Sequence, residues 1–138
     1  MSVLWQDLHE GEGPKAWTFG PLTITDFVRY QGASGDMNPL HHDVDFAKDA
    51  GFGAPVAVGM FTAGAMNVYA TKWLGAANVR NTRMRWKKPA FPGSELSVGG
   101  TVVKKYEEAG ERKVDIELVI SDSEGQIALH GWMTFVVR

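Results

Sequence analysis

The sequence MFTAGAMNVYATKWL, residues 60–74, is the most informative segment for the fold class of this chain. Its composition and spacing predict a single helix, about 22 Å long. The stripe that we expect to face inward consists mostly of small or flexible residues, so a neighbouring layer must pack very close to it. A sheet wrapped around the helix is the layer that this pattern favours. The expected inward stripe comprises Met60, Ala63, Gly64, Met66, Val68, Ala70 and Trp73.

The chain beyond Gly75 is typical of antiparallel strands joined by turns. Polar and apolar residues alternate in the first of these segments and again, very regularly, in the third. Clusters of Pro, Gly, Asp and Glu separate the segments, as turn residues do. We expect strands at residues 80–88, 95–106, 114–120 and 127–137, with turns at residues 89–93, 107–111 and 122–125.

The segment before the long helix predicts a short strand and two shorter helices. The strand covers residues 15–19. The first helix is expected to start after an N-cap at Thr25 and to run to about Ala33, and Asp43 is expected to cap the second, residues 44–50. The order of a strand, helices and then four antiparallel strands indicates an α+β fold, with one long helix against one face of the sheet.

Composition narrows the class of protein. The 138 residues fit a single domain, residues 1–138, and a net charge of −2 gives no reason to expect nucleic acid or an anionic membrane as partner. The absence of cysteine excludes disulfides and thiolate metal sites. The N-terminal residues lack the pattern of a signal peptide, and no apolar stretch is long enough for a membrane span. The expected location is the cytoplasm.

The segment SGDMNPLH, residues 34–41, places a carboxylate and an imidazole in a stiff turn. Gly35 permits unusual backbone angles, and Pro39 locks its own φ and keeps Asn38 out of the helical region. The directions of the Asp36 and His41 side chains are therefore set before a substrate binds. Such a pair suits a hydration or dehydration reaction, which needs one group to polarise water and another to move a proton.

The run FVRYQGASGDMNPLH, residues 27–41, resembles the hydratase-2 signature of the MaoC-like (R)-specific enoyl-CoA hydratases and (3R)-hydroxyacyl-thioester dehydratases. Weaker matches occur at residues 5–8, 56–60, 85–86 and 89–93. The resemblance implies a hotdog fold, in which an antiparallel sheet wraps a long central helix. It also implies a lyase of fatty acid metabolism that interconverts trans-2-enoyl and (3R)-3-hydroxyacyl thioesters by adding or removing water.

The resemblance also implies which residues form the functional site. Asp36 and His41 match the family's catalytic pair, and Asn38 matches the residue that shapes the turn and helps to orient the pair. Gly59 matches the residue whose backbone N–H binds the thioester oxygen, which suits the unpaired N–H groups of a helix start. We expect no metal and no cofactor, since coenzyme A or acyl carrier protein is part of the acyl-thioester substrate. The expected assembly is a homodimer.

Two departures from the family pattern leave the preferred acyl chain open. Many relatives have His where this chain has Val58, and a small residue or Ser where it has Asn67.

Two other functions also remain as alternatives. The chain could be the catalytic member of a pair of different hotdog subunits, since it keeps both Asp36 and His41. A thioesterase is disfavoured, because hotdog thioesterases usually carry an acidic residue within the central helix, whereas residues 60–74 contain no Asp or Glu.

Simpler interpretations compete with several of these assignments. Asp36 and His41 could merely form a capped loop, and Gly59 could be a packing glycine. A metal at His42 and Asp43, next to His41, is disfavoured, because adjacent histidines in an extended segment point to opposite sides and no third ligand has convincing spacing. His9 and His130 are expected to be surface or structural residues. The basic residues of 80–88 are expected to lie mostly on a solvated strand face, although they could contact coenzyme A phosphates or an acidic carrier protein. Met60, Met66 and Met84 could either fill the core or line an acyl tunnel.

Overall fold

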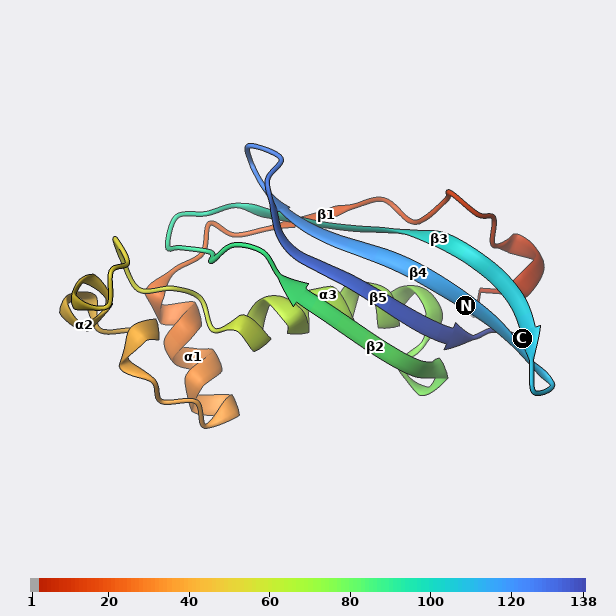
Figure 1. Ribbon diagram of the computed structural model, residues 1–138, viewed down its shortest axis with the longest axis horizontal. Coiled ribbons are helices and arrows are strands. Elements are labelled where there is room, and N and C mark those ends of the chain that lie inside the picture. Colours follow the sequence, from red (N-terminus) through yellow and green to blue (C-terminus); the bar gives the residue numbers. More distant parts are fainter. Residues whose placement is uncertain (1–2) are drawn as a thin grey trace.

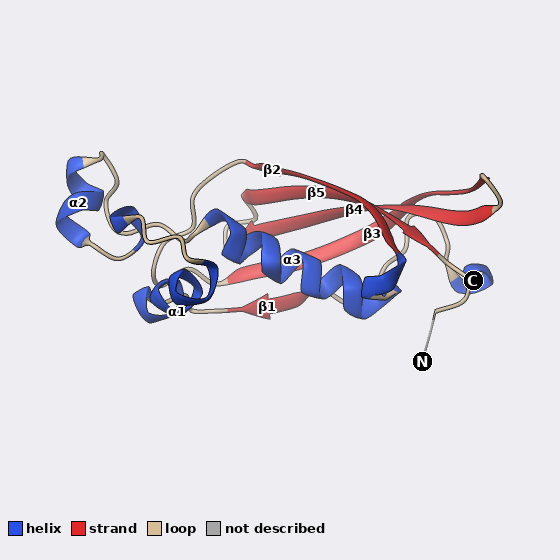
Figure 2. Ribbon diagram, turned by 90° about the horizontal axis from the view of Figure 1, so that it is seen from below, coloured by secondary structure: helices blue, strands red, loops and turns tan. Residues whose placement is uncertain are grey.

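A computed structural model describes residues 3–138 of the protein. Its main feature is a five-stranded antiparallel sheet that curves over one long helix, α3 (Gly59–Leu74) (Figures 1 and 2). The strands lie in the order β1-β3-β4-β5-β2, and their bounds are β1 Trp17–Phe19, β2 Val79–Trp86, β3 Leu96–Glu108, β4 Glu111–Asp122 and β5 Ile127–Val136. The expected α+β architecture, with one helix against one face of a sheet, is therefore confirmed.

The other helices gather away from the sheet. Helices α1 (Ile24–Ser34) and α2 (Val44–Asp49) lie together at the end of the molecule where α3 begins (Figures 1 and 2). Three short 3₁₀ turns complete the set: η1 (Trp5–Asp7), η2 (Pro39–His41) and η3 (Ala76–Asn78). No helix within residues 3–138 is long and apolar enough to cross a membrane.

Helix α3 packs on the sheet through a narrow stripe of side chains. Ala63, Met66 and Ala70 are fully buried. Met60 and Val68, which we expected to face inward, are 54% and 46% exposed, so that part of the prediction is wrong. The reason is that α3 is apolar on nearly all sides, so spacing alone does not say which stripe meets the sheet.

The close approach of helix and sheet relies on glycines in the strands. A Cβ atom built on Gly131 of β5 would lie 2.4 Å from the sulfur of Met66. A Cβ atom on Gly100 of β3 would lie 2.5 Å from Leu118 Cδ2 and 3.4 Å from the ring of Tyr69. The expected tight packing is thus present, and small residues on both layers allow it.

Several element boundaries differ from the sequence predictions. Helix α1 starts after Thr23, not Thr25: the Thr23 hydroxyl accepts from the Asp26 N–H at 3.1 Å, and the Asp26 carboxylate accepts from the Thr23 N–H at 2.8 Å. This reciprocal pair stabilises the helix start two residues earlier than expected. Strand β3 ends at Glu108 and strand β4 begins at Glu111. The turn between them is therefore only Ala109 and Gly110, shorter than the expected turn at residues 107–111. The predicted cap at Asp43 is confirmed.

Candidate active site

The loop after α1 brings the predicted acid and base together. Gly35 ends the helix in the left-handed conformation, with φ of 78°, and the chain then turns sharply into η2. As a result Asp36 Oδ2 lies 3.7 Å from His41 Nε2. The imidazole is buried, whereas the carboxylate side chain is 46% exposed. The pair therefore has one enclosed member and one that faces solvent.

The hydrogen bonds of His41 determine its tautomer. Nδ1 lies 2.8 Å from the carbonyl oxygen of Val56, which can only accept, so Nδ1 carries a proton and donates it. In the neutral ring, the lone pair is then on Nε2, the atom that faces Asp36. A second bond, from the Val56 N–H to the carbonyl of Leu40, ties the loop to the same segment. The neutral imidazole is thus oriented as a proton acceptor toward Asp36.

The Asp36 and Asn38 side chains are held by local hydrogen bonds. Asp36 Oδ1 accepts from the Asn38 N–H at 3.3 Å, which leaves Oδ2 toward His41. Asn38 Oδ1 accepts from the Leu40 N–H at 3.0 Å and caps η2. Asn38 therefore shapes the turn, as the resemblance implied, and its importance for a reaction stays a prediction.

Gly59 is the first residue of α3 and follows Val56, the partner of His41, by three residues. Its carbonyl accepts from the Trp86 indole at 3.0 Å and from the Thr62 hydroxyl at 2.8 Å. Within residues 3–138 no acceptor takes its N–H. A Cβ atom at this position would lie 3.2 Å from Trp86 Nε1, so packing against that indole also favours glycine. The geometry is compatible with both interpretations of Gly59, the packing one and the ligand-binding one.

One residue of this region was missed by the sequence analysis. Gln31, on α1, is only 1% exposed, and its side chain contacts the backbone of the loop. The signal that could have identified it is its position four residues after the buried Phe27, on the inward face of the helix, where a polar side chain needs partners.

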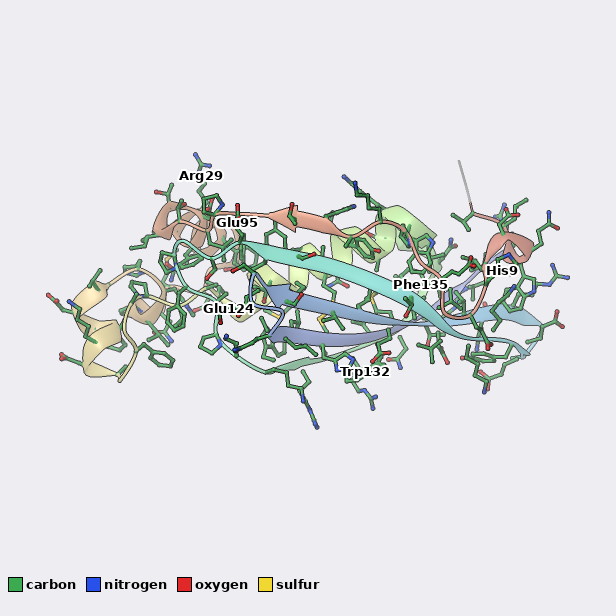
Figure 3. All side chains as sticks on the ribbon, turned by 90° about the horizontal axis from the view of Figure 1, so that it is seen from above. His9, Arg29, Glu95, Glu124, Trp132 and Phe135 are labelled. Atoms are coloured by element: carbon green, nitrogen blue, oxygen red, sulfur yellow. The ribbon has the colours of Figure 1, made fainter. Side chains whose placement is uncertain are left out.

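The remaining candidates lie elsewhere or serve the structure. His9 is exposed and lies at the opposite end of the molecule from Arg29 of α1 (Figure 3). His130 Nε2 lies 2.5 Å from Glu117 Oε1 on β4, and Asn67 donates to the Ala63 carbonyl of its own helix. Val58 is buried ahead of α3.

The basic residues near β2 mostly have partners. Arg80 bonds Glu111, Lys88 bonds Asp122 and Gln126, and the guanidinium of Arg83 lies 4.6 Å from the ring centroid of Trp132. These contacts support the interpretation of a solvated, charge-balanced strand face. A hollow of about 350 Å³ on the sheet is lined by Asn81, Arg83, Val103, Asp115, Ile116, Trp132, Met133 and Thr134. It does not include Asp36 or His41.

Comparisons with known proteins agree with the geometry. The family model described as a MaoC like domain matches residues 9–126, which is most of the chain. The 3-hydroxyacyl-thioester dehydratase Y of Mycobacterium tuberculosis is 37% identical over 99 residues, covering 64% of this chain and 34% of that protein. The chain therefore spans about a third of the length of this curated relative.

Two solved structures show the same fold. The R-hydratase PhaJ1 from Pseudomonas aeruginosa is 20% identical, with a TM-score of 0.85 over 99% of this chain and 86% of that one. A chain of the ChsH1–ChsH2 complex from Mycobacterium tuberculosis is 18% identical, with a TM-score of 0.77 over 90% of this chain and 94% of that one. The expected hotdog fold is thus confirmed, and this chain belongs to the family of MaoC-like dehydratase domains.

Proposed function

We propose that this protein is a hydro-lyase that interconverts trans-2-enoyl and (3R)-3-hydroxyacyl thioesters. The observation that carries the proposal is the pair formed by Asp36 and His41. The His41 Nε2 and Asp36 Oδ2 atoms are 3.7 Å apart, too far for a direct hydrogen bond but suitable for contacting one shared water or hydroxyl. Membership of the MaoC-like family supports the same reaction.

In the direction of hydration, the pair holds one water beside C3 of the enoyl chain. The water oxygen bonds to C3 while Asp36 and His41 together accept its proton, and a proton returned by the pair bonds to C2. Dehydration is the reverse: the pair removes the C2 proton and protonates the leaving 3-hydroxyl. The two groups share the proton as a coupled unit, so no single residue is assigned as acid or base.

Negative charge develops on the thioester oxygen during both directions of the reaction. We assign the N–H of Gly59 as its hydrogen-bond donor, because this group lies at the start of α3, where the helix dipole is positive. The loss of one such donor in other enzymes costs about 3–4 kcal/mol of barrier. Coenzyme A or acyl carrier protein enters this scheme as part of the substrate, and the scheme needs no metal.

We further infer that a second chain packs against α3. Met60 and Val68 project from α3 on the side that the sheet leaves uncovered, and apolar side chains in that position favour a protein partner. A homodimer is the simplest assembly. The name of the ChsH1–ChsH2 complex shows that a related fold also occurs in complexes of two different chains, so an unlike partner is the alternative.

The test is the ultraviolet absorbance of the enoyl-thioester bond after the purified protein is mixed with crotonyl-CoA and with longer trans-2-enoyl-CoA substrates. We expect loss of absorbance, with the (3R)-hydroxyacyl product identified by chiral analysis. A folded sample that hydrates no chain length would contradict the proposal. Release of free thiol from saturated acyl-CoA would instead indicate the thioesterase alternative.

The expected cytoplasmic location stays a prediction, to be checked by fractionation of the source cells.

A further inference from the structure

Gln31 connects α1 to the loop that carries the acid–base pair. Its side-chain Nε2 donates to the carbonyl of Asp36 at 2.8 Å and to the carbonyl of Asn38 at 3.0 Å. Its own backbone carbonyl accepts from the Gly35 N–H at 2.8 Å. Three residues of the loop, Gly35, Asp36 and Asn38, are therefore attached to one residue of the helix.

The orientation of this amide is unambiguous. Because both neighbours of Nε2 are carbonyl oxygens, the NH₂ group must face them, and Oε1 is left to accept. It does so from His42 Nδ1, at 2.9 Å. The side chain of Gln31 thus bonds the loop on both sides of His41 in the sequence, at Asp36 and Asn38 before it and at His42 after it.

Burial makes these bonds important. Gln31 is 1% exposed, and a buried amide without partners is costly, whereas Gln31 has three. An apolar residue would fit the inward face of α1, where Phe27 is fully buried. It would remove the side-chain donor of the Asp36 carbonyl and leave the Asn38 carbonyl with the His41 N–H alone. The glutamine is therefore explained by the loop and not by the packing of the helix.

We propose that Gln31 is a positioning residue, which sets the distance between the Asp36 carboxylate and the His41 imidazole. This inference rests on the proposed function. The two members of the pair have separate anchors: Gln31 holds the backbone of Asp36, and Val56 holds the ring of His41. Loss of the Gln31 anchor would free the backbone of Asp36, whereas the Val56 carbonyl would still hold the His41 ring. The 3.7 Å separation on which a shared water depends would then change.

The first test is Gln31→Met, which keeps the length of the side chain and removes its polar atoms. We expect kcat for enoyl-CoA hydration to fall about 10- to 100-fold, because small misplacements of reacting groups have effects of that size. KM should change less than about threefold, since Gln31 does not contact the substrate in this scheme. Gln6→Met, at an exposed glutamine in η1, is the matched control and should leave both constants unchanged.

A second variant separates positioning from mere stability. In Gln31→Glu, the ionised carboxylate cannot donate to the two carbonyls, but the protonated acid can donate to one of them. The titratable groups beside it are Asp36, His41 and His42, and these are also present in the wild type. We therefore expect the ratio of variant to wild-type kcat to rise as the pH falls, while circular dichroism shows the same folded fraction for both proteins.

The outcomes distinguish this inference from the function on which it rests. A folded Gln31→Met with wild-type kcat, or a Gln31→Glu ratio that does not change with pH, would overturn the positioning role. If the wild type itself hydrates no enoyl thioester, the proposed function fails. The role of Gln31 in holding the loop is then tested by hydrogen exchange alone. Faster exchange of the backbone amides of residues 36–42 in Gln31→Met would support that role, and unchanged exchange would refute it.

Discussion

At the scale of the residue, His41 shows how one hydrogen bond selects a chemical form. The bond from Nδ1 to the Val56 carbonyl keeps the proton on that nitrogen, so Nε2 of the neutral ring can accept a proton. Asp36 contributes its Oδ2 because Oδ1 is occupied by the Asn38 N–H. The direction of each side chain is therefore determined by backbone groups of its own neighbourhood.

Removal of either ionisable group should abolish most of the proposed activity. We expect Asp36→Asn and His41→Ala each to lower kcat by about 10²–10⁴-fold, the usual contribution of acid–base catalysis. The change should appear in steady-state kinetics with crotonyl-CoA, and the thermal unfolding midpoint should stay close to that of the wild type. Asp49→Asn and His9→Ala, at exposed positions, serve as controls. Wild-type turnover in either of the first two variants would refute the assignment of the pair.

Gly59→Ala tests whether the start of α3 binds the thioester oxygen. The added methyl would crowd both the N–H and the Trp86 indole, whose Nε1 lies 3.2 Å from the Cβ position. We expect kcat/KM to fall about tenfold or more, because a donor that is partly blocked stabilises the developing charge less.

The double variant Gly59→Ala with Trp86→Ala separates this effect from packing, since it gives the new methyl room. The loss of kcat/KM should persist beyond that of Trp86→Ala alone. Full recovery to the level of Trp86→Ala would show that Gly59 is needed only for contact with the indole.

At the scale of the element, helix α1 carries Gln31 and ends at the loop, so its stability matters for the site. Its first turn is held by the reciprocal bonds between Thr23 and Asp26. The Asp26 carboxylate also accepts from the Thr23 hydroxyl at 2.7 Å, and this bond, followed by the one from the Thr23 N–H, lowers the pKa of Asp26. A carboxyl whose pKa is lower in the folded state stabilises the fold above its unfolded pKa, and this contribution is lost as the pH falls through the folded value.

Thr23→Ala and Thr25→Ala distinguish the true helix start from the one that sequence spacing suggested. We expect Thr23→Ala to lower the free energy of unfolding by about 1 kcal/mol, as the loss of an N-cap does. Thr25→Ala, at an exposed position inside the helix, should have a much smaller effect. Urea unfolding at neutral pH measures both, and the difference should shrink in acid as Asp26 becomes protonated. Equal effects of the two substitutions would contradict the capping role of Thr23.

At the scale of the whole molecule, the distance between α3 and the sheet depends on glycines in the strands, which have no side chain to keep the layers apart. Two adjacent glycines of β3 provide a matched comparison, because they face opposite sides of the sheet. A Cβ atom on Gly100 would lie 2.5 Å from Leu118 Cδ2 and 3.0 Å from the Glu117 carbonyl oxygen, whereas the nearest atom to one on Gly99 is Ala16 Cβ at 3.5 Å.

We therefore expect Gly100→Ala to destabilise the fold by about 1–3 kcal/mol, the usual effect of overpacking. Gly99→Ala should be nearly neutral. The free energy of unfolding in urea is the measurement, and a stable Gly100→Ala would show that Leu118 and Tyr69 can move aside without loss.

The uncovered side of α3 predicts an assembly. We expect Met60→Lys and Val68→Lys to reduce the mass in solution, measured by light scattering, because a charge on this face would be buried against the partner. Val103→Lys introduces the same charge at a 50% exposed site on β3 and should leave the mass unchanged. A wild-type protein that is monomeric yet fully active would contradict the inferred partner.

Features that depend on residues close together in the chain could be predicted from the sequence. The alternation over β4, the turn at Asp122 and the cap at Asp43 are local patterns, and each predicted its element correctly. The placement of Asp36 and His41 in one stiff turn is local in the same sense, because they are five residues apart.

Features that depend on contacts between residues distant in the chain could not be predicted, because they form only when the chain folds. The inward stripe of α3 is selected by strands that lie after it, since the helix is apolar on nearly every side. The tautomer of His41 depends on Val56, fifteen residues later, and the partner of Gly59 is Trp86, twenty-seven residues later. Such contacts leave no periodic signal in the sequence, because their geometry exists only after the helix and the sheet have packed together.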